Sequence, residues 1–245
     1  MEYVRANTMN ARLSPSPYDS SSSLELIPVV ASASPRAEGV PQGDAEQDHA
    51  LALARLLPPS EHWRLYADLK DRVRFIDIET TGLAPEDLIT LVGISDGFTS
   101  TVLVRGRDLH RERMAALLDG AGLLVTFNGK SFDLPRLRRA FPGLPWHLPH
   151  FDLAVEGRRL GLGGGLKKVE RRLGYTRPRD LRGVDGPGAV RLWRAHCQGD
   201  PRALRRLVRY CRADVRALVH LAERIYERLE RRHGPEGPGW LPPRG

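Results

Sequence analysis

The sequence has only two cysteines, Cys197 and Cys211. Two thiols cannot build the disulfide framework of a small secreted domain, and so few fit a reducing compartment. No apolar run approaches the roughly 18 residues of a membrane-spanning helix, and no basic stretch leads into an apolar one at the N-terminus. We therefore expect a cytoplasmic protein without a membrane partner.

Lysine is scarce, and arginine supplies most of the positive charge of a chain whose net charge is +8. Residues 1–70 carry 6 basic and 9 acidic side chains, whereas residues 71–245 carry 32 basic and 21 acidic ones. A basic globular region behind an acidic segment indicates a polyanionic partner, nucleic acid first and an anionic membrane second. A general bias toward arginine is the alternative explanation. No feature identifies a protein partner.

Composition divides the 245 residues into four stretches. Residues 1–45 are rich in serine and proline and bury too little to offset their ordering entropy, so we expect them to be disordered. Residues 46–70 are predicted to form a helical lead-in. Residues 71–233 hold enough apolar side chains for one globular domain, and the Pro/Gly-rich residues 234–245 are predicted to be a flexible tail.

The hydrophobic pattern of the globular part alternates between strands and helices. Apolar alternation and short apolar runs predict strands over Val73–Ile78, Leu88–Ser95, Thr99–Val104, Gly122–Phe127 and 150–153. Helical spacing predicts helices over 109–118, 131–141, 165–173, 187–197 and 202–232. Three antiparallel strands followed by β-α-β units give an α/β fold with a mixed five-stranded sheet and helices packed on it. This order resembles the ribonuclease H-like arrangement.

The first predicted strand carries two acids, Asp77 and Glu79, one residue apart and followed at once by a turn. Because strand side chains alternate between faces, both carboxylates point the same way. Two such acids repel each other unless a cation lies between them, and oxygen ligands suit Mg²⁺ or Mn²⁺. Taken alone, however, the pair is more often a solvated feature at the edge of a sheet.

Further acids follow at positions where they could join the first two. Asp133 falls in the first turn of a predicted helix, just after a buried strand, where an acid also complements the helix dipole. Tyr210 and Asp214 are spaced i, i+4 and therefore share one helix face, next to an apolar stripe. Asp152 is expected to cap the helix that follows it. Each of these residues has an ordinary structural explanation when it is considered alone.

In this order, Asp77, Glu79, Asp133, Tyr210 and Asp214 resemble the DEDD (DnaQ-like) superfamily of 3′–5′ exonucleases, in its tyrosine subclass. The motifs that carry the resemblance are Asp77–Gly82, Asn128–Asp133 and Tyr210–Asp214.

Within that superfamily the chain is most similar to the YprB-like, ribonuclease H-like bacterial proteins. Leu166–Glu170, Leu173–Gly174 and Gly199–Asp200 add to this similarity, which covers about residues 63–230. Arg209 stands where the histidine subclass would carry its histidine.

The resemblance implies a metal-dependent exonuclease that releases nucleoside 5′-monophosphates from a single-stranded 3′ end of DNA or RNA. It implies two Mg²⁺ or Mn²⁺ ions held by Asp77, Glu79, Asp133 and Asp214, with Asp77 bridging both and Tyr210 positioning the attacking water. Two alternatives remain. One is a ribonuclease H-like, structure-specific endonuclease, and the other is a nucleic-acid-binding scaffold without turnover.

Weaker candidates for substrate contacts surround these motifs. Thr81 and Gly82 are expected to line the terminal nucleotide through their backbones. Asn128, Lys130 and Lys167 are expected to reach phosphate groups. Turn-forming roles for Asn128 and Lys130, and a solvated helix face at Lys167, are the competing interpretations.

Overall fold

The computed structural model describes residue 52 and residues 54–234. The segment predicted to be disordered, residues 1–45, lies outside the described residues, as does the predicted tail beyond residue 234. Among the described helices, none combines the length and the apolar character that a membrane-crossing segment requires.

The described part of the predicted lead-in contains two 3₁₀ helices, η1 (Pro59–Tyr66) and η2 (Lys70–Arg72). Pro59 suits the first position of η1 because proline has no backbone N–H to leave unpaired there. Trp63 and Tyr66 are buried and belong to a hydrophobic cluster with strand and helix residues of the domain. The lead-in therefore packs as part of the domain.

Five strands form one sheet in the order β3-β2-β1-β4-β5, and β1 is its central strand. The strands are β1 (Val73–Thr80), β2 (Ile89–Ser95), β3 (Ser100–Val104), β4 (Leu123–Thr126) and β5 (His150–Asp152). β1 pairs antiparallel with β2 and β2 with β3, whereas β4 runs parallel to both β1 and β5. The predicted mixed sheet is confirmed.

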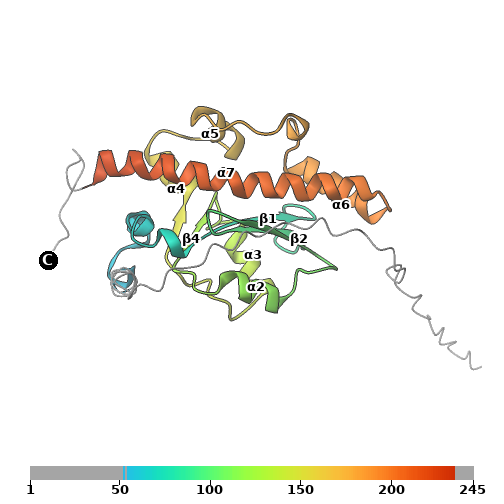
Figure 1. The fold of residues 1–245 in the computed structure, drawn as a ribbon, viewed down its shortest axis with the longest axis horizontal. Coiled ribbons are helices and arrows are strands. Elements are labelled where there is room, and N and C mark those ends of the chain that lie inside the picture. The colour runs from blue at the N-terminus through green and yellow to red at the C-terminus, as the bar shows by residue number, and fades with distance from the viewer. Residues whose placement is uncertain (1–51, 53, 235–245) are drawn as a thin grey trace, which may run out of the picture. The chain divides into compact units, whose positions relative to one another are not determined.

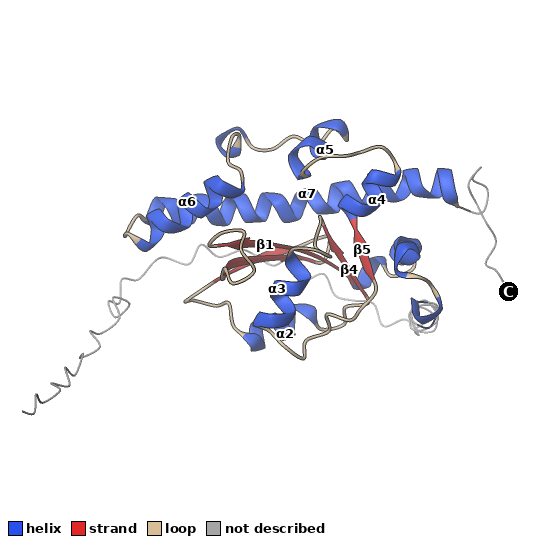
Figure 2. Cartoon of the chain, turned by 180° about the vertical axis from the view of Figure 1, so that it is seen from behind, coloured by secondary structure: helices blue, strands red, loops and turns tan. Residues whose placement is uncertain are grey.

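Helices cover both faces of this sheet. They are α2 (Arg111–Leu118), α3 (Asp133–Ala140), α4 (Leu153–Arg159), α5 (Leu166–Arg172), η3 (Arg179–Leu181), α6 (Gly186–Cys197) and α7 (Pro201–His233). Figure 1 and Figure 2 show α2 and α3 on one side of the sheet and α7, with α4, α5 and α6, on the other. The predicted α/β class and the predicted helices of the globular part are thus confirmed.

The central strand β1 sends alternate side chains to the two helical layers. Phe75 packs in a cluster with side chains of α7, whereas Ile76 packs in a cluster with side chains of α2 and α3. Asp77 and Glu79 are two and four residues beyond Phe75, so they share its face of the sheet. Both carboxylates therefore point toward α7.

The 33-residue helix α7 lies close against the sheet. The Asp200 carboxylate caps it by accepting a backbone N–H of the first turn at 2.8 Å. A Cβ atom on Gly93 of β2 would lie 2.5 Å from Val215 Cγ2, so glycine allows the strand and the helix to approach this closely. This packing places Tyr210 and Asp214 next to the acids of β1.

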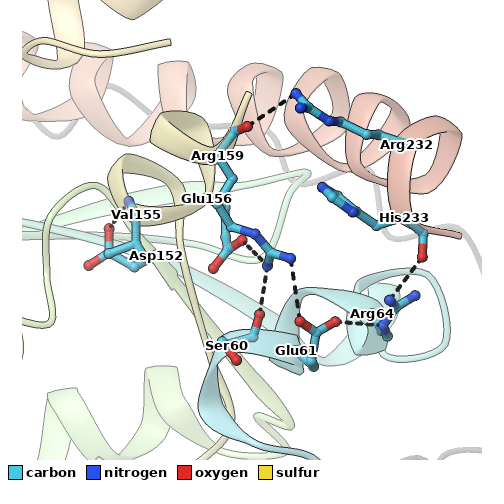
Figure 3. A network of polar contacts seen from close by, with 9 residues as sticks. All are labelled: Ser60, Glu61, Arg64, Asp152, Val155, Glu156, Arg159, Arg232 and His233. Atoms are coloured by element: carbon cyan, nitrogen blue, oxygen red, sulfur yellow. Dashed lines mark hydrogen bonds and ion pairs between the residues drawn. The ribbon is translucent and has the colours of Figure 1, made fainter. Parts of the chain in front are cut away.

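Figure 3 shows a polar network that joins the lead-in to α4 and to the end of α7. The Arg159 guanidinium lies 2.8 Å from Glu156 and 3.4 Å from Glu61. Arg64 pairs with Glu61 at 2.8 Å and donates to the His233 carbonyl at 2.9 Å. Ion pairs of this exposure each contribute little to stability, but together they link η1 to both helices.

Candidate active site

A cleft of about 660 Å³ opens between the sheet, α5, α6 and α7. All five residues predicted to be catalytic line it: Asp77, Glu79, Asp133, Tyr210 and Asp214. They come from three elements, β1, the start of α3 and the middle of α7. The convergence of the four carboxylates, on which the sequence interpretation depends, is therefore present in the structure.

Asp133 is held against β1 by the backbone of the strand itself. It is the first residue of α3, and its Oδ1 accepts the Ile78 N–H at 3.2 Å. Ile78 lies between Asp77 and Glu79 in the chain, so this bond sets the third acid beside the first two. A carboxylate in the first turn also interacts favourably with the helix dipole.

The turn before α3 is organised by Asp152 at the end of β5. Its Oδ1 accepts the Asn128 N–H at 2.8 Å and its Oδ2 accepts the Lys130 N–H at 3.0 Å. Asn128 adopts a left-handed conformation with φ 65°, which non-glycine residues rarely do. Asp152 also accepts the Ala154 N–H at 3.1 Å, which confirms its predicted role as the cap of α4. One buried carboxylate thus fixes both the turn and the next helix.

The four acids are largely withdrawn from water. Burial and the neighbouring carboxylates Asp214 and Glu79 hold the pKa of Asp77 well above its ordinary value. Burial, with Asp214 and Asp133, does the same for the pKa of Glu79. Burial raises the pKa of Asp133 to about 7 and the pKa of Asp214 to about 6, the latter against the lowering effect of Arg177. Burial and mutual repulsion therefore outweigh the positive charge that Arg177 brings to the cluster.

The donor atoms of this cluster fit a divalent cation. Asp77 Oδ2 is buried and has no hydrogen-bond partner. Oxygen atoms of Asp77 and Glu79 and the Cys211 sulfur all lie within 4.8 Å of one another. Burial and the adjacent Glu79 and Asp77 keep the pKa of the Cys211 thiol well above its usual value, so the thiol stays protonated. The carboxylate oxygens are left as the ligands, and these suit Mg²⁺ or Mn²⁺.

Two cationic side chains approach the acids from the α5 side. Arg177 contacts Asp214, and its guanidinium also binds Glu170 through two bonds of 2.7 and 2.5 Å. Lys167 Nζ donates to the Tyr210 hydroxyl at 3.2 Å. Burial, with Asp214 and Glu79, raises the pKa of Tyr210, so its phenol is neutral and able to donate.

Sequence reasoning did not identify Arg177. It lies in an irregular segment between α5 and η3, where neither helical nor strand spacing marks a side chain as buried. Its pairing with Glu170 and Asp214 depends on contacts over 7 and 37 residues of chain. The only local signal is an arginine followed directly by a proline, and many exposed loops share it.

The predicted substrate-contacting residues divide into two groups. Asn128 and Lys167 line the cleft, whereas Thr81, Gly82 and Lys130 are not among its lining residues. The Thr81 hydroxyl donates to Asp87 Oδ1 at 2.7 Å, and a Cβ on Gly82 would lie 2.5 Å from Asp87 Oδ2. Lys130 is exposed and lines a different hollow. In the structure, these three residues therefore lie in or beside turns and do not line the cleft.

The stability of the metal-free protein is expected to fall as pH rises from about 4 to about 7. Carboxyl groups of the unfolded chain titrate near pH 4, whereas the pKa of Asp214 is about 6 and that of Asp133 about 7 in the fold. In that window the native state holds more protons than the unfolded state, so the free energy of unfolding decreases with pH.

Thermal unfolding in EDTA between pH 5 and 8 measures this fall. Added Mn²⁺ should raise the melting temperature more at pH 7.5 than at pH 5.5, because protons compete with the ion for the carboxylates. The Asp133→Asn variant serves as the comparison and should show a shallower fall in EDTA. An equal slope in both proteins would contradict the assignment.

Comparison with known proteins places the chain in a superfamily. Residues 74–226 match the family model of the RNase H superfamily. The family B DNA polymerase from Pyrobaculum calidifontis shares the fold, with a TM-score of 0.51 and 20% identity over 62% of this chain and 24% of that one. A comparison with curated proteins gave no match.

Two further structures are similar to the chain, with lower TM-scores. Escherichia coli RNase D, an exoribonuclease, has a TM-score of 0.48 and 18% identity over 81% of this chain and 45% of that one. The catalytic core of RRP6 from Trypanosoma brucei has a TM-score of 0.46 and 16% identity over 75% and 45%. The chain thus spans less than half the length of these three structures.

The family match extends from β1 to the second half of α7 and includes every residue of the acidic cluster. The mixed sheet β3-β2-β1-β4-β5, with helices on both faces, agrees with that match. The resemblance that the sequence motifs carry is confirmed at the level of the superfamily. Membership of this superfamily supports a function as a nuclease. The chain belongs to the RNase H superfamily.

Proposed function

We propose that this chain is a metal-dependent 3′–5′ exonuclease that hydrolyses phosphodiester bonds of DNA or RNA and releases nucleoside 5′-monophosphates. The observation that carries the proposal is the convergence of Asp77, Glu79, Asp133 and Asp214 with Tyr210 in one cleft. Membership of the RNase H superfamily supports a nuclease in general. The exonuclease direction and the use of two ions rest on the ordered set of motifs.

The carboxylates would hold the divalent ions, which lower the pKa of a bound water and offset charge on the phosphate. Asp77 and Glu79 lie on one strand face, so their oxygens are held close together without a flexible loop between them. Asp133 and Asp214 approach from two helices that pack on β1. This rigid support suits a site that must keep the attacking water and the phosphate in line.

Tyr210 would orient the attacking water as a hydrogen-bond donor. Its raised pKa excludes the phenolate form at neutral pH, so the hydroxyl is not the base. Lys167 Nζ lies 3.2 Å from that hydroxyl and 4.9 Å from the ring centroid, which restricts the rotation of the phenol. Asn128 also lines the cleft, within the turn that Asp152 holds.

Replacing Tyr210 with Phe is expected to lower kcat about 10- to 100-fold, because one positioned donor is lost while the carboxylates remain. Mn²⁺ should still raise the melting temperature of the variant as much as that of the parent protein. Tyr226→Phe removes a hydroxyl from the same helix outside the cleft and is the matched control. Equal turnover by the two variants would remove Tyr210 from the mechanism.

End-labelled single-stranded DNA and RNA oligonucleotides, incubated with Mn²⁺ or Mg²⁺, test the proposal. An exonuclease acting from the 3′ end releases mononucleotide at once from a 3′-labelled strand and gives a descending ladder from a 5′-labelled one. Internal fragments from a structured substrate would favour the endonuclease alternative. Binding without any product would favour a scaffold, and both of these results would overturn the proposal.

A further inference from the structure

A second hollow, of about 430 Å³, adjoins the candidate active site next to α5. Residues of α5 and of the segment 175–183 line it. It shares Lys167 and Arg171 with the active-site cleft, so the two cavities are neighbours. Its volume falls within the range of pockets that hold small ligands or parts of larger ones.

The lining of this hollow has an excess of positive charge. Lys167, Arg171, Arg177 and Arg182 face one acid, Glu170. Both Glu170 oxygens are bound by Arg177, at 2.7 and 2.5 Å, so the carboxylate is already neutralised. The remaining cations have no counter-charge within the hollow.

Arg171 and Arg182 are the side chains available to a ligand. Both are exposed, and neither guanidinium group makes a hydrogen bond or an ion pair with any described residue. Lys167, by contrast, is already bonded to the Val184 carbonyl and to Tyr210. A guanidinium presents paired N–H donors in one plane, which matches the oxygens of a phosphate group.

The part of the sequence that surrounds the hollow is positively charged, like the lining itself. Residues 157–222 carry 17 basic and 5 acidic side chains, so they account for the whole positive excess of the protein. Of these five acids, Glu170 and Asp214 are buried, and Asp185 and Asp200 cap helices. An anion that approaches the hollow therefore meets a surface that attracts it.

One wall of the hollow is suited to a nucleoside. The Tyr175 ring is half-buried and lies 5.5 Å from the His220 ring, and its hydroxyl donates to the Ala213 carbonyl at 3.5 Å. These contacts hold the ring in place without covering it. Aromatic rings of this kind stack with bases of any sequence. The adjacent Thr176 is exposed and adds a hydroxyl to the lining.

We propose that this hollow is a phosphate-binding subsite in which Arg171 and Arg182 hold a phosphate group beside the active-site cleft. The phosphate belongs either to a polynucleotide strand whose end enters the cleft or to a free nucleoside 5′-monophosphate. The strand source rests on the proposed function, whereas binding of the free nucleotide does not. Glu170 and Arg177 belong to the lining of the hollow, and the same Arg177 guanidinium contacts Asp214 in the active-site cleft.

Binding to the metal-free protein tests the subsite without any hydrolysis. Inorganic phosphate and a nucleoside 5′-monophosphate are titrated calorimetrically, in EDTA, into the parent protein, Arg182→Gln and Arg179→Gln. Arg182 lines only the second hollow, and Arg179, three residues earlier, lines none of the cavities described above. Arg182→Gln should bind at least about tenfold more weakly, because a charge-assisted bond is lost, and Arg179→Gln should bind like the parent.

Anisotropy of a labelled single-stranded oligonucleotide, also in EDTA, separates the two sources of phosphate. Weaker oligonucleotide binding by Arg182→Gln alone supports the strand, and weaker mononucleotide binding alone supports the free nucleotide. Loss of both supports a subsite that accepts either. If Arg182→Gln binds all three probes as tightly as Arg179→Gln does, the proposal is overturned. The nuclease assay on the parent protein is independent of this result.

Discussion

Replacing Asp77 with Asn is expected to abolish hydrolysis and, at the same time, to make the metal-free protein more stable. The loss of activity should reach about three orders of magnitude, because the ion contributes several kcal/mol to the transition state. The gain in stability follows from burial: Asp77 Oδ2 has no hydrogen-bond partner, and three other carboxylates surround it. A neutral amide of the same shape removes the repulsion and the cost of burying the charge.

The two effects are measured separately. Melting temperatures in EDTA at pH 7.5 should rise by a few degrees, since each kcal/mol shifts a domain of this size by roughly 2–4 °C. The increase that Mn²⁺ gives to the parent protein should disappear. Asp119→Asn, an exposed acid outside the cleft, is the matched control and should change neither quantity. An active Asp77→Asn protein would refute the assignment of the metal site.

Replacing Arg177 with Met is expected to lower the free energy of unfolding by about 3–5 kcal/mol, because it leaves a buried charge without its partner. Glu170 is only 2% exposed and receives two guanidinium bonds. Methionine fills much of the volume but can neutralise neither Glu170 nor Asp214. The loss corresponds to roughly 10 °C in melting temperature.

A double-mutant cycle distinguishes loss of the pair from loss of packing. Glu170→Leu combined with Arg177→Met removes both charges, and most of the lost stability should return. Arg179→Met changes an exposed arginine of the same segment and should stay within about 0.5 kcal/mol of the parent. If the two single losses simply add in the double variant, the buried pair does not explain them.

The sheet and the acidic cluster were predictable because their signals are local. Alternation along β1 places Asp77 and Glu79 on one face of the strand. The i, i+4 spacing of Tyr210 and Asp214 places these two residues on one face of their helix. The prediction that these two pairs form one site came from the order of the motifs, which resembles that of a known family. Spacing alone gives no distance between β1 and α7. In the structure, the absence of a side chain at Gly93 allows β2, the neighbour of β1, to lie close to α7.

The features that sequence reasoning missed depend on long-range contacts in irregular segments. Arg177 is buried only because α5 and α7 bring Glu170 and Asp214 to it. The left-handed Asn128 is held by a carboxylate 24 residues away, at Asp152. Asp152 was recognised as a helix cap, but its second role in the Asn128 turn has no local signature.

The position of α7 in the chain has a consequence during synthesis. Asp77 and Asp214 are 137 residues apart, and α7 is the last element of the described structure. A chain emerging from the ribosome therefore presents the three acids of β1 and α3 well before Tyr210 and Asp214 exist. Contacts between such distant segments form late, because the entropy cost of closing a long loop opposes them and because a domain folds as a unit. A chain that stops short of Tyr210 would carry most of the basic side chains of residues 157–222 but not the complete set of residues that we propose for hydrolysis.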